Sequence, residues 1–115
     1  MPDCIFCRIA AGEIPAAIVK QNGDLIAFRD VNPQAPTHVL VIPRQHVKSV
    51  AEADTPEGEA MLGKLMRFGA QVARELGLES SGYRLVLNTG ENGGQSVFHI
   101  LLHVLGGRRM AWPPG

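Results

Sequence analysis

The sequence predicts an α+β domain in which a mostly antiparallel, five-stranded sheet carries one long helix and one short helix. Three observations support this fold class. Asn22-Gly23 lies between two apolar-rich runs, which is the strongest short-range signal of a β-hairpin. Further β-branched and apolar runs are bounded by proline or glycine. One stretch in the middle of the chain repeats apolar residues at helical spacing.

The short helix and the strands follow from local composition. The short helix is predicted over residues 4–11, because Gly12 suits the cap that ends a helix. The strands are predicted at residues 18–20, 24–29, 38–43, 83–87 and 97–105. Residues 31–37 contain two prolines and residues 88–96 contain three glycines, so both segments are predicted to be loops.

The long helix has clear start and stop signals. Asp54 and Thr55 are both candidates for its N-cap, and the proline that follows fits a first helical turn. Glu57 and Glu59 suit the positive end of the helix dipole. Apolar residues then recur at steps of four and three, at Met61, Leu65, Phe68, Val72 and Leu76. A glycine ends this stripe, which is expected to cover the sheet.

Length and charge restrict the possible functions. The 115 residues are expected to form one domain over residues 1–115. Lys+Arg and Asp+Glu both total 11, so no bulk potential attracts a polyanion, and no nucleic-acid partner is expected. The lack of a signal peptide and of a long apolar run predicts no membrane partner and a cytoplasmic location. The two cysteines are then expected to be reduced.

All four histidines lie in or beside predicted strands, at positions 38, 46, 99 and 103. Alternate residues of a strand share a face, so His99, Leu101 and His103 are predicted to point the same way. The opposite face is then predicted to join the core through Phe98, Ile100, Leu102 and Val104. Leu101 interrupts this otherwise polar face. A functional face of the strand and a plain packing contact of Leu101 with a neighbouring strand or helix are equally good interpretations.

The glycine-rich loop Asn88–Ser96 leads directly into this strand. Glycines such as Gly94 let a backbone approach an anion closely, and successive N–H groups can form a concave nest. Gln95 and Ser96 add side-chain donors. The alternative is a plain flexible hairpin loop. The Gly-Lys-Ser/Thr ending of a nucleoside-triphosphatase loop is missing, so the adjoining histidines favour a simpler phosphate site.

Cys4 and Cys7 form a Cys-x-x-Cys pair, which supplies half of a tetrahedral zinc site. His46 and His99 are the natural candidates for the other two ligands. Two free thiols or a redox pair are the alternatives. A thioredoxin-like pair normally follows a strand, whereas this one has only three residues before it, so zinc is favoured.

Two further residues have both a functional and a structural reading. Asp30 follows a predicted strand, where a carboxylate can hold both hydroxyls of a ribose or can simply cap a nearby turn. Trp112 lies in the tail 108–115 and is read as a buried anchor or an interface residue.

In their order along the chain, these motifs resemble the Hint branch of the histidine triad (HIT) family. The resembling segments are Ile5–Ile9, Glu13–Ala16, Ala27–Asp30, Asn32–His38, Val41–Pro43, Gly93–Val97, His99–Gly107 and Trp112–Gly115. The resemblance covers nearly the whole chain. It implies a HIT-like fold whose homodimer joins two sheets into one ten-stranded sheet. It also implies hydrolysis of nucleoside phosphoramidates through a nucleotidyl-histidine intermediate.

The resemblance also implies roles for individual residues around a bound purine nucleoside monophosphate or phosphoramidate. The base would be lined by Ile14, Phe28 and Val31, and Asp30 would hold the ribose. The phosphate would be surrounded by Asn88, Gly94, Gln95, Ser96, Val97 and His103. Zinc would be held by Cys4, Cys7, His46 and His99. His38 would orient the site, and the tail carrying Trp112 would reach the other subunit.

The chain departs from the family at the residue that matters most for catalysis. The family signature His-φ-His-φ-His-φ-φ, with φ apolar, here runs from His99 to Leu105 with Leu101 at its centre. The middle histidine is the nucleophile in family members, and leucine has no lone pair with which to attack phosphorus. The chain is therefore expected to be inactive or nearly so, whether as an engineered mutant or as a natural non-catalytic nucleotide-binding module. A zinc-stabilised interaction module is a further alternative. Ala111, where many relatives have histidine, puts the contact across subunits in doubt.

Overall fold

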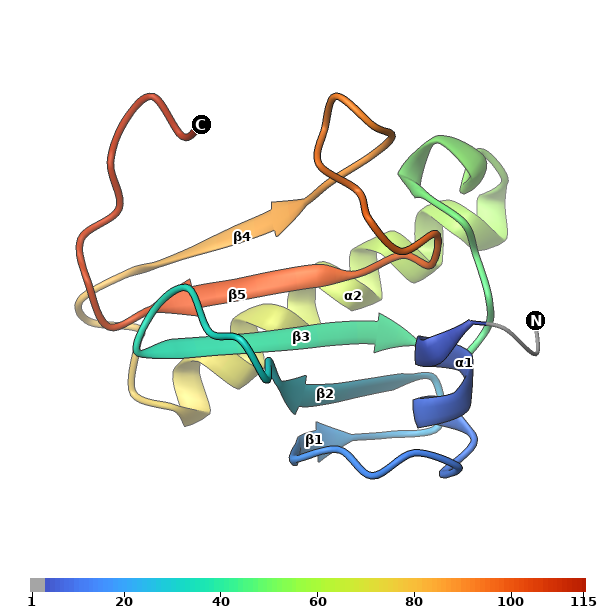
Figure 1. The fold of residues 1–115 in the computed structure, drawn as a ribbon, viewed down its shortest axis with the longest axis horizontal. Helices are drawn as coiled ribbons and strands as arrows, with labels where there is room; N and C mark the ends of the chain where they lie inside the picture. Colours follow the sequence, from blue (N-terminus) through green and yellow to red (C-terminus); the bar gives the residue numbers. More distant parts are fainter. Residues whose placement is uncertain (1–3) are drawn as a thin grey trace.

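The computed structural model of the protein describes residues 4–115 and has the predicted α+β architecture (Figure 1). The elements are α1 (Ile5–Ala10), β1 (Ile18–Gln21), β2 (Leu25–Arg29), β3 (Thr37–Pro43), the 3-10 turn η1 (Val50–Glu52), α2 (Pro56–Glu75), β4 (Tyr83–Leu87) and β5 (Leu102–Gly106). The strand order is β1-β2-β3-β5-β4, and every neighbouring pair is antiparallel. Helix α2 lies across one face of the sheet and α1 lies at the end of β3 (Figure 1). Among residues 4–115, no helix is both long and apolar enough to cross a membrane.

Strands β2 and β3 are buried on both faces, and alternation assigns their side chains to two cores. One core lies between the sheet and α2 and includes Leu25, Ala27, Val39, Val41, Leu65, Phe68 and Val72. The other packs beneath α1 and consists of Phe6, Ile9, Ile26, Phe28, Leu40 and Ile42. The second core therefore fixes α1, with its two cysteines, against the sheet.

The predicted start of α2 is confirmed in its detail. Of the two candidate caps, Thr55 is the N-cap, and its hydroxyl accepts from the backbone N–H of Gly58 at 3.0 Å. The hairpin turn is also confirmed, because the Asn22 side chain accepts from the N–H groups of Asp24 and Leu25, both at 2.8 Å.

The prediction of one strand over 97–105 is wrong at its start. β5 begins only at Leu102, which pairs with Val41 on one side and Leu87 on the other. Residue 100 instead donates its backbone N–H to the carbonyl of Val47 at 2.7 Å. The opposite residue, Pro43, has no N–H with which to continue the ladder, and its carbonyl lies 2.9 Å from Nε2 of His99. Phe98, predicted to be core, is 49% exposed. The alternation of faces expected along a strand therefore does not apply to residues 98–101.

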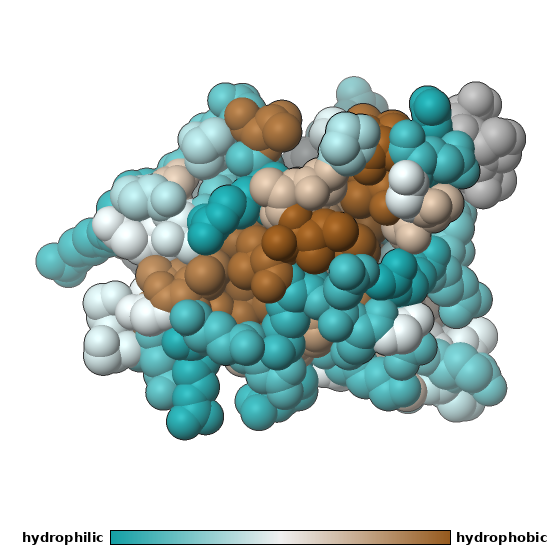
Figure 2. Space-filling view, turned by 90° about the horizontal axis from the view of Figure 1, so that it is seen from below, coloured by the Kyte–Doolittle hydropathy of each residue, from teal (hydrophilic) through white to brown (hydrophobic). Residues whose placement is uncertain are grey.

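Hydrophobic side chains also reach the surface. Figure 2 shows an apolar band on the side of the molecule where β1 forms the edge of the sheet, bordered by hydrophilic residues. Ile18 in β1 is 47% exposed, and Val31, in the loop after β2, is completely exposed.

Candidate functional site

The four predicted metal ligands converge from three separate segments. Cys4 caps the N-terminus of α1 and Cys7 lies within that helix, whereas His46 follows β3 and His99 precedes β5. Their sulfur and nitrogen atoms all lie within 4.8 Å of one another. Burial in the second core and the turn after Pro43 bring these segments together, so the cluster ties α1 to the sheet.

The distances in this cluster fit the edges of a tetrahedral metal site. Cys4 Sγ lies 3.3 Å from His99 Nδ1, Cys7 Sγ lies 3.2 Å from His46 Nδ1, and the two Nδ1 atoms are 3.2 Å apart. Zinc bonds of about 2.3 Å to sulfur and about 2.0 Å to nitrogen require ligand atoms about 3.5 Å apart. The donor set and its spacing therefore suit zinc.

The surroundings of His99 prepare it for a metal. Its Nε2 lies 2.9 Å from the carbonyl oxygen of Pro43 and must donate to it, so a neutral ring presents the lone pair of Nδ1 to the cysteines. Burial lowers the pKa of His99 and nearby His46 lowers it further, whereas the hydrogen bond to the Pro43 carbonyl acts in the opposite direction. The net lowering of the pKa favours the neutral imidazole, which is the form that binds metal.

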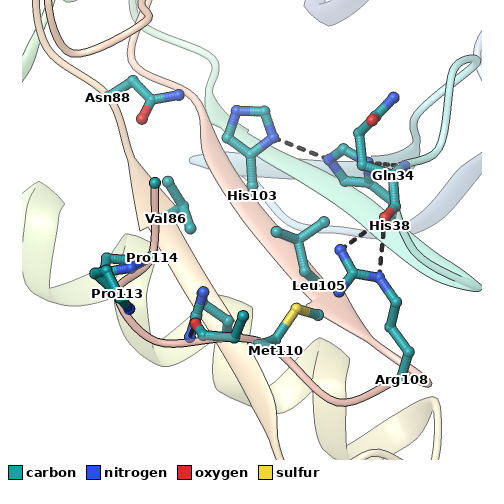
Figure 3. A pocket seen from close by; sticks show the side chains of 13 residues that line it. Gln34, His38, Val86, Asn88, His103, Leu105, Arg108, Met110, Pro113 and Pro114 are labelled. Carbon is teal, nitrogen blue, oxygen red and sulfur yellow. Dashed lines mark hydrogen bonds between the residues drawn. The ribbon is translucent and has the colours of Figure 1, made fainter.

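A second cluster joins Asp30, His38 and His103 on the other side of the site (Figure 3 shows the two histidines). The backbone N–H of Gln34 donates to His38 Nδ1 at 3.0 Å, so the proton of neutral His38 is on Nε2. That Nε2 lies 2.9 Å from His103 Nδ1 and 3.4 Å from an Asp30 oxygen. The N–H of neutral His103 is therefore on its own Nε2. The result is a directed relay from Gln34 through His38 to His103.

The same hydrogen bonds argue against a second metal at Asp30, His38 and His103. A metal on His38 Nε2 would place the proton of a neutral ring on Nδ1, where the N–H of Gln34 already donates. His99 shows the opposite arrangement, in which the outer nitrogen donates and the inner nitrogen is left for a metal. We therefore assign hydrogen bonding to the second cluster and metal binding to the first.

Burial lowers the pKa of both relay histidines. For His38 the nearby carboxylate of Asp30 opposes this shift, and for His103 the neighbouring His38 adds to it. Both rings are therefore expected to be neutral at pH 7, so the relay offers a ligand a neutral N–H donor.

Stability is accordingly expected to fall as the pH drops below 6.5, the ordinary pKa of the two histidines. Between that value and the lower pKa values of the folded state, the unfolded chain binds protons that the folded chain does not, which favours unfolding. Thermal unfolding measured from about pH 7.5 to about pH 5 tests this. The decline should be shallower in His103→Asn. A melting temperature that stays level or rises in the parent chain as the pH falls would contradict the assignment.

The residues predicted to surround a phosphate line one small cavity of about 110 Å³. Its lining consists of Asn88, Gly94, Gln95, Ser96, Val97, His99, Leu101 and His103. The turn at Gly94 has φ of 85°, a conformation that glycine adopts without strain. Leu101 is half-buried here and packs against the core beneath α1. His99, Leu101 and His103 thus line one cavity although only His103 lies in β5.

Gln95 has a structural task that the sequence did not indicate. Its Nε2 donates to the carbonyls of Lys48 at 2.7 Å and Val97 at 3.2 Å, and its Oε1 accepts from the N–H of Gly90 at 2.9 Å. Both side-chain N–H groups are therefore used to shape the loop. A phosphate in this cavity would then be bound by donors other than the Gln95 amide.

A larger cavity of about 500 Å³ adjoins the small one, and the two share Asn88 and His103 (Figure 3). It lies between the sheet and the C-terminal segment, and its other lining residues are Gln34, His38, Arg84, Val86, Leu105, Arg108, Met110, Ala111, Pro113, Pro114 and Gly115. Arg84 donates to the carbonyl of Ala111 at 2.9 Å. Trp112 is 83% exposed, so its reading as a buried anchor within the chain is wrong.

The residues predicted to contact a nucleoside are placed less uniformly. Phe28 is buried in the core beneath α1, with its ring centroid 6.0 Å from that of Phe6, and Ile14 packs at the border of the same core. Asp30 is half-buried, whereas Val31 is fully exposed. Sequence reasoning missed Phe6, whose place in an apolar helix gave no sign that it would contact Phe28.

Comparisons with known proteins identify the family of this chain and agree with its fold. The HIT domain family model matches residues 11–110. An uncharacterised HIT-like protein of Synechococcus elongatus is 51% identical over 113 residues, which cover 98% of this chain and 97% of that protein. A 14 kDa zinc-binding protein of Zea mays is 48% identical over 113 residues, covering 96% and 87%. A crystal structure of a HIT family hydrolase from Legionella pneumophila has a TM-score of 0.94 and 46% identity, covering 98% and 100%.

Proposed function

Since this chain belongs to the HIT family, we propose that it is a Hint-branch protein that binds a purine nucleoside monophosphate or phosphoramidate. The observation that carries the proposal is the small cavity, in which the glycine loop, His103 and Leu101 meet. Phosphoramidate hydrolysis is the reaction expected of the same site with histidine at position 101. The hydrolase name of the Legionella relative supports a hydrolytic reaction in the family. The cytoplasm remains the expected location.

The ligand would span the small cavity and the neighbouring sheet. The backbone N–H groups of Ser96 and Val97 would donate to the phosphate oxygens, because those of Gly94 and Gln95 already donate to carbonyls within the loop, and the Nε2–H of His103 would donate to one oxygen as well. Asp30 would accept from the ribose hydroxyls, and Ile14, Phe28 and Val31 would contact the base. The fully exposed side chain of Val31 leaves apolar surface for a base to cover.

Leu101 makes binding without turnover the expected behaviour of the chain as it stands. In the family reaction a histidine at this position attacks phosphorus, and the amine leaves with a proton. Water then splits the P–N bond to the histidine. Leucine can fill the space but cannot supply the electron pair. The contacts to phosphate and ribose do not depend on that electron pair.

The cluster of Cys4, Cys7, His46 and His99 would hold zinc. The metal would supply a structural cross-link between α1 and the segments that flank the small cavity. The zinc-binding name of the maize relative supports this choice of metal.

We further propose a homodimer in which the sheets of two copies join edge to edge. The sheet has two edge strands, β1 and β4, whose outer backbone groups lack a neighbouring strand within residues 4–115. Light scattering is expected to give twice the mass of the chain. A monomer at all accessible concentrations would contradict the dimer and leave nucleotide binding untouched.

Calorimetry with adenosine monophosphate tests the proposed binding. The parent chain is expected to bind it, and Asp30→Asn should weaken binding about tenfold by removing a charged acceptor for the ribose. Asp24→Asn is the matched control, because that carboxylate is 71% exposed in the β1–β2 turn. No heat at millimolar nucleotide, or equal effects of both substitutions, would count against the assigned site.

A further inference from the structure

We propose that Arg108 is a positioning residue that fixes where the protons sit on His38 and His103. The C-terminal segment is thereby coupled to the small cavity, although Arg108 itself lines only the larger one. The inference rests on the proposed function only in so far as it concerns nucleotide affinity. The arrangement of the protons can be measured without any nucleotide.

Arg108 grips the loop between β2 and β3 with two donors. Its Nε and Nη2 donate to the carbonyl oxygen of Gln34 at 3.2 and 3.0 Å (Figure 3). Its Nη1 donates to the carbonyl of Arg109 at 3.2 Å, which fixes the guanidinium against its own segment. Arg108 follows Gly106 and Gly107 at the end of β5, so the grip connects the strand of His103 to the loop before His38.

These hydrogen bonds hold Gln34, whose backbone N–H favours one tautomer of His38. Gln34 accepts from Arg108 through its carbonyl and donates its N–H to His38 Nδ1 at 3.0 Å. Two side-chain contacts within the same loop support it, since Asp30 accepts from the N–H of Asn32 and Gln34 Nε2 donates to the Asn32 carbonyl. Packing also holds the loop, since Ala35 is buried and Pro36 lies close to Gly107, but the side-chain hydrogen bonds that reach the Gln34 carbonyl from outside the loop come from Arg108.

The tautomer decides what a ligand meets in the small cavity. With Gln34 in place, His38 donates through Nε2 to His103 Nδ1, and His103 keeps its N–H on Nε2. If Gln34 moved away, only the Asp30 carboxylate, 3.4 Å from His38 Nε2, would still favour the proton on that nitrogen, and a fraction of the pairs would reverse, with His103 donating through Nδ1 and His38 accepting at Nε2. His103 Nε2 would then present a lone pair, which repels an anionic oxygen instead of binding it. Arg108 therefore favours the anion-binding form of His103 without touching the anion.

The experiment is histidine side-chain NMR with ¹⁵N labelling, on the metal-loaded chain without nucleotide. In the parent chain, both His38 and His103 are expected to be Nε2–H tautomers. In Arg108→Gln, His103 is expected to show a mixture with Nδ1–H. Affinity for adenosine monophosphate, measured on the same samples, should fall about fivefold, as expected for one impaired hydrogen bond. Arg108→Lys keeps the charge but lacks the fork, so its mixture should lie between the two.

Two control variants separate positioning from a general loosening of the segment. Arg109→Gln changes the neighbouring exposed arginine. Only the backbone carbonyl of Arg109 accepts a hydrogen bond from Arg108, and the substitution keeps that carbonyl. Arg84→Gln releases the carbonyl of Ala111 but leaves the grip on Gln34 intact. Both controls should keep the parent tautomers. If Arg108→Gln does not fold, Arg108→Lys carries the test.

The outcomes distinguish this inference from the proposed function. Parent tautomers that persist in Arg108→Gln or, where that variant does not fold, in Arg108→Lys would overturn the role of Arg108. The same mixture in Arg84→Gln would also overturn it, because the effect would then come from the segment as a whole. A parent chain that shows the expected tautomers but binds no nucleotide would remove the proposed function and leave the positioning role standing.

Discussion

Leu101→His is expected to raise hydrolysis of an adenosine phosphoramidate by about three orders of magnitude or more. The side chain at 101 lines the small cavity together with His103 and the glycine loop, so an imidazole there would lie where the phosphate is expected. The new ring would supply the electron pair that attacks phosphorus, and the amine would leave with a proton. Single-turnover measurement of amine release gives the rate directly.

A polar but non-nucleophilic variant provides the control for this gain. Leu101→Asn places a polar group in the same half-buried position and should leave the rate near that of the parent chain. Trapping a nucleotidyl adduct on residue 101 in the histidine variant would identify the attacking group. Equal rates for the leucine, asparagine and histidine forms would end the assignment of position 101 as the nucleophile.

Removal of the proposed zinc ion is expected to have the second largest effect. Each chain purified without chelator should hold about one zinc, because His99 offers its lone pair to the cysteines whereas His38 does not. Chelation should lower the unfolding temperature by about 10 °C, since the cross-link between α1 and the sheet is lost. The core between the sheet and α2 and the core beneath α1 should keep the metal-free chain folded.

Two substitutions show whether this shift belongs to the proposed metal site. Cys7→Ser removes one ligand, so it should abolish stable zinc binding, and chelator should then have no further effect on its unfolding temperature. His103→Asn alters the second cluster and should retain the zinc of the parent chain. Absence of metal in the parent chain, or loss of metal in His103→Asn, would refute the assignment of the four ligands.

The sequence alone determined the elements whose signals are local. The turn at Asn22-Gly23, a cap at Asp54 or Thr55 and an apolar stripe from Met61 to Leu76 were all predicted, because neighbouring residues suffice to specify a turn, a helix end and a buried face. The structure then chose Thr55 as the cap. The set of Cys4, Cys7, His46 and His99 could also be chosen in advance. Few residue types bind zinc, and the chain contains few of them.

Only the tertiary structure decided the features that depend on backbone groups distant in the chain. The late start of β5 follows from Pro43 and Val47, the occupied amide of Gln95 follows from the Lys48 carbonyl, and the tautomer of His38 follows from the N–H of Gln34. Every residue except proline has a backbone N–H, and every residue has a carbonyl, so the identity of a residue does not reveal which of these groups a side chain will meet. Folding brings particular ones together, and that choice sets the protons on which the proposed anion site depends.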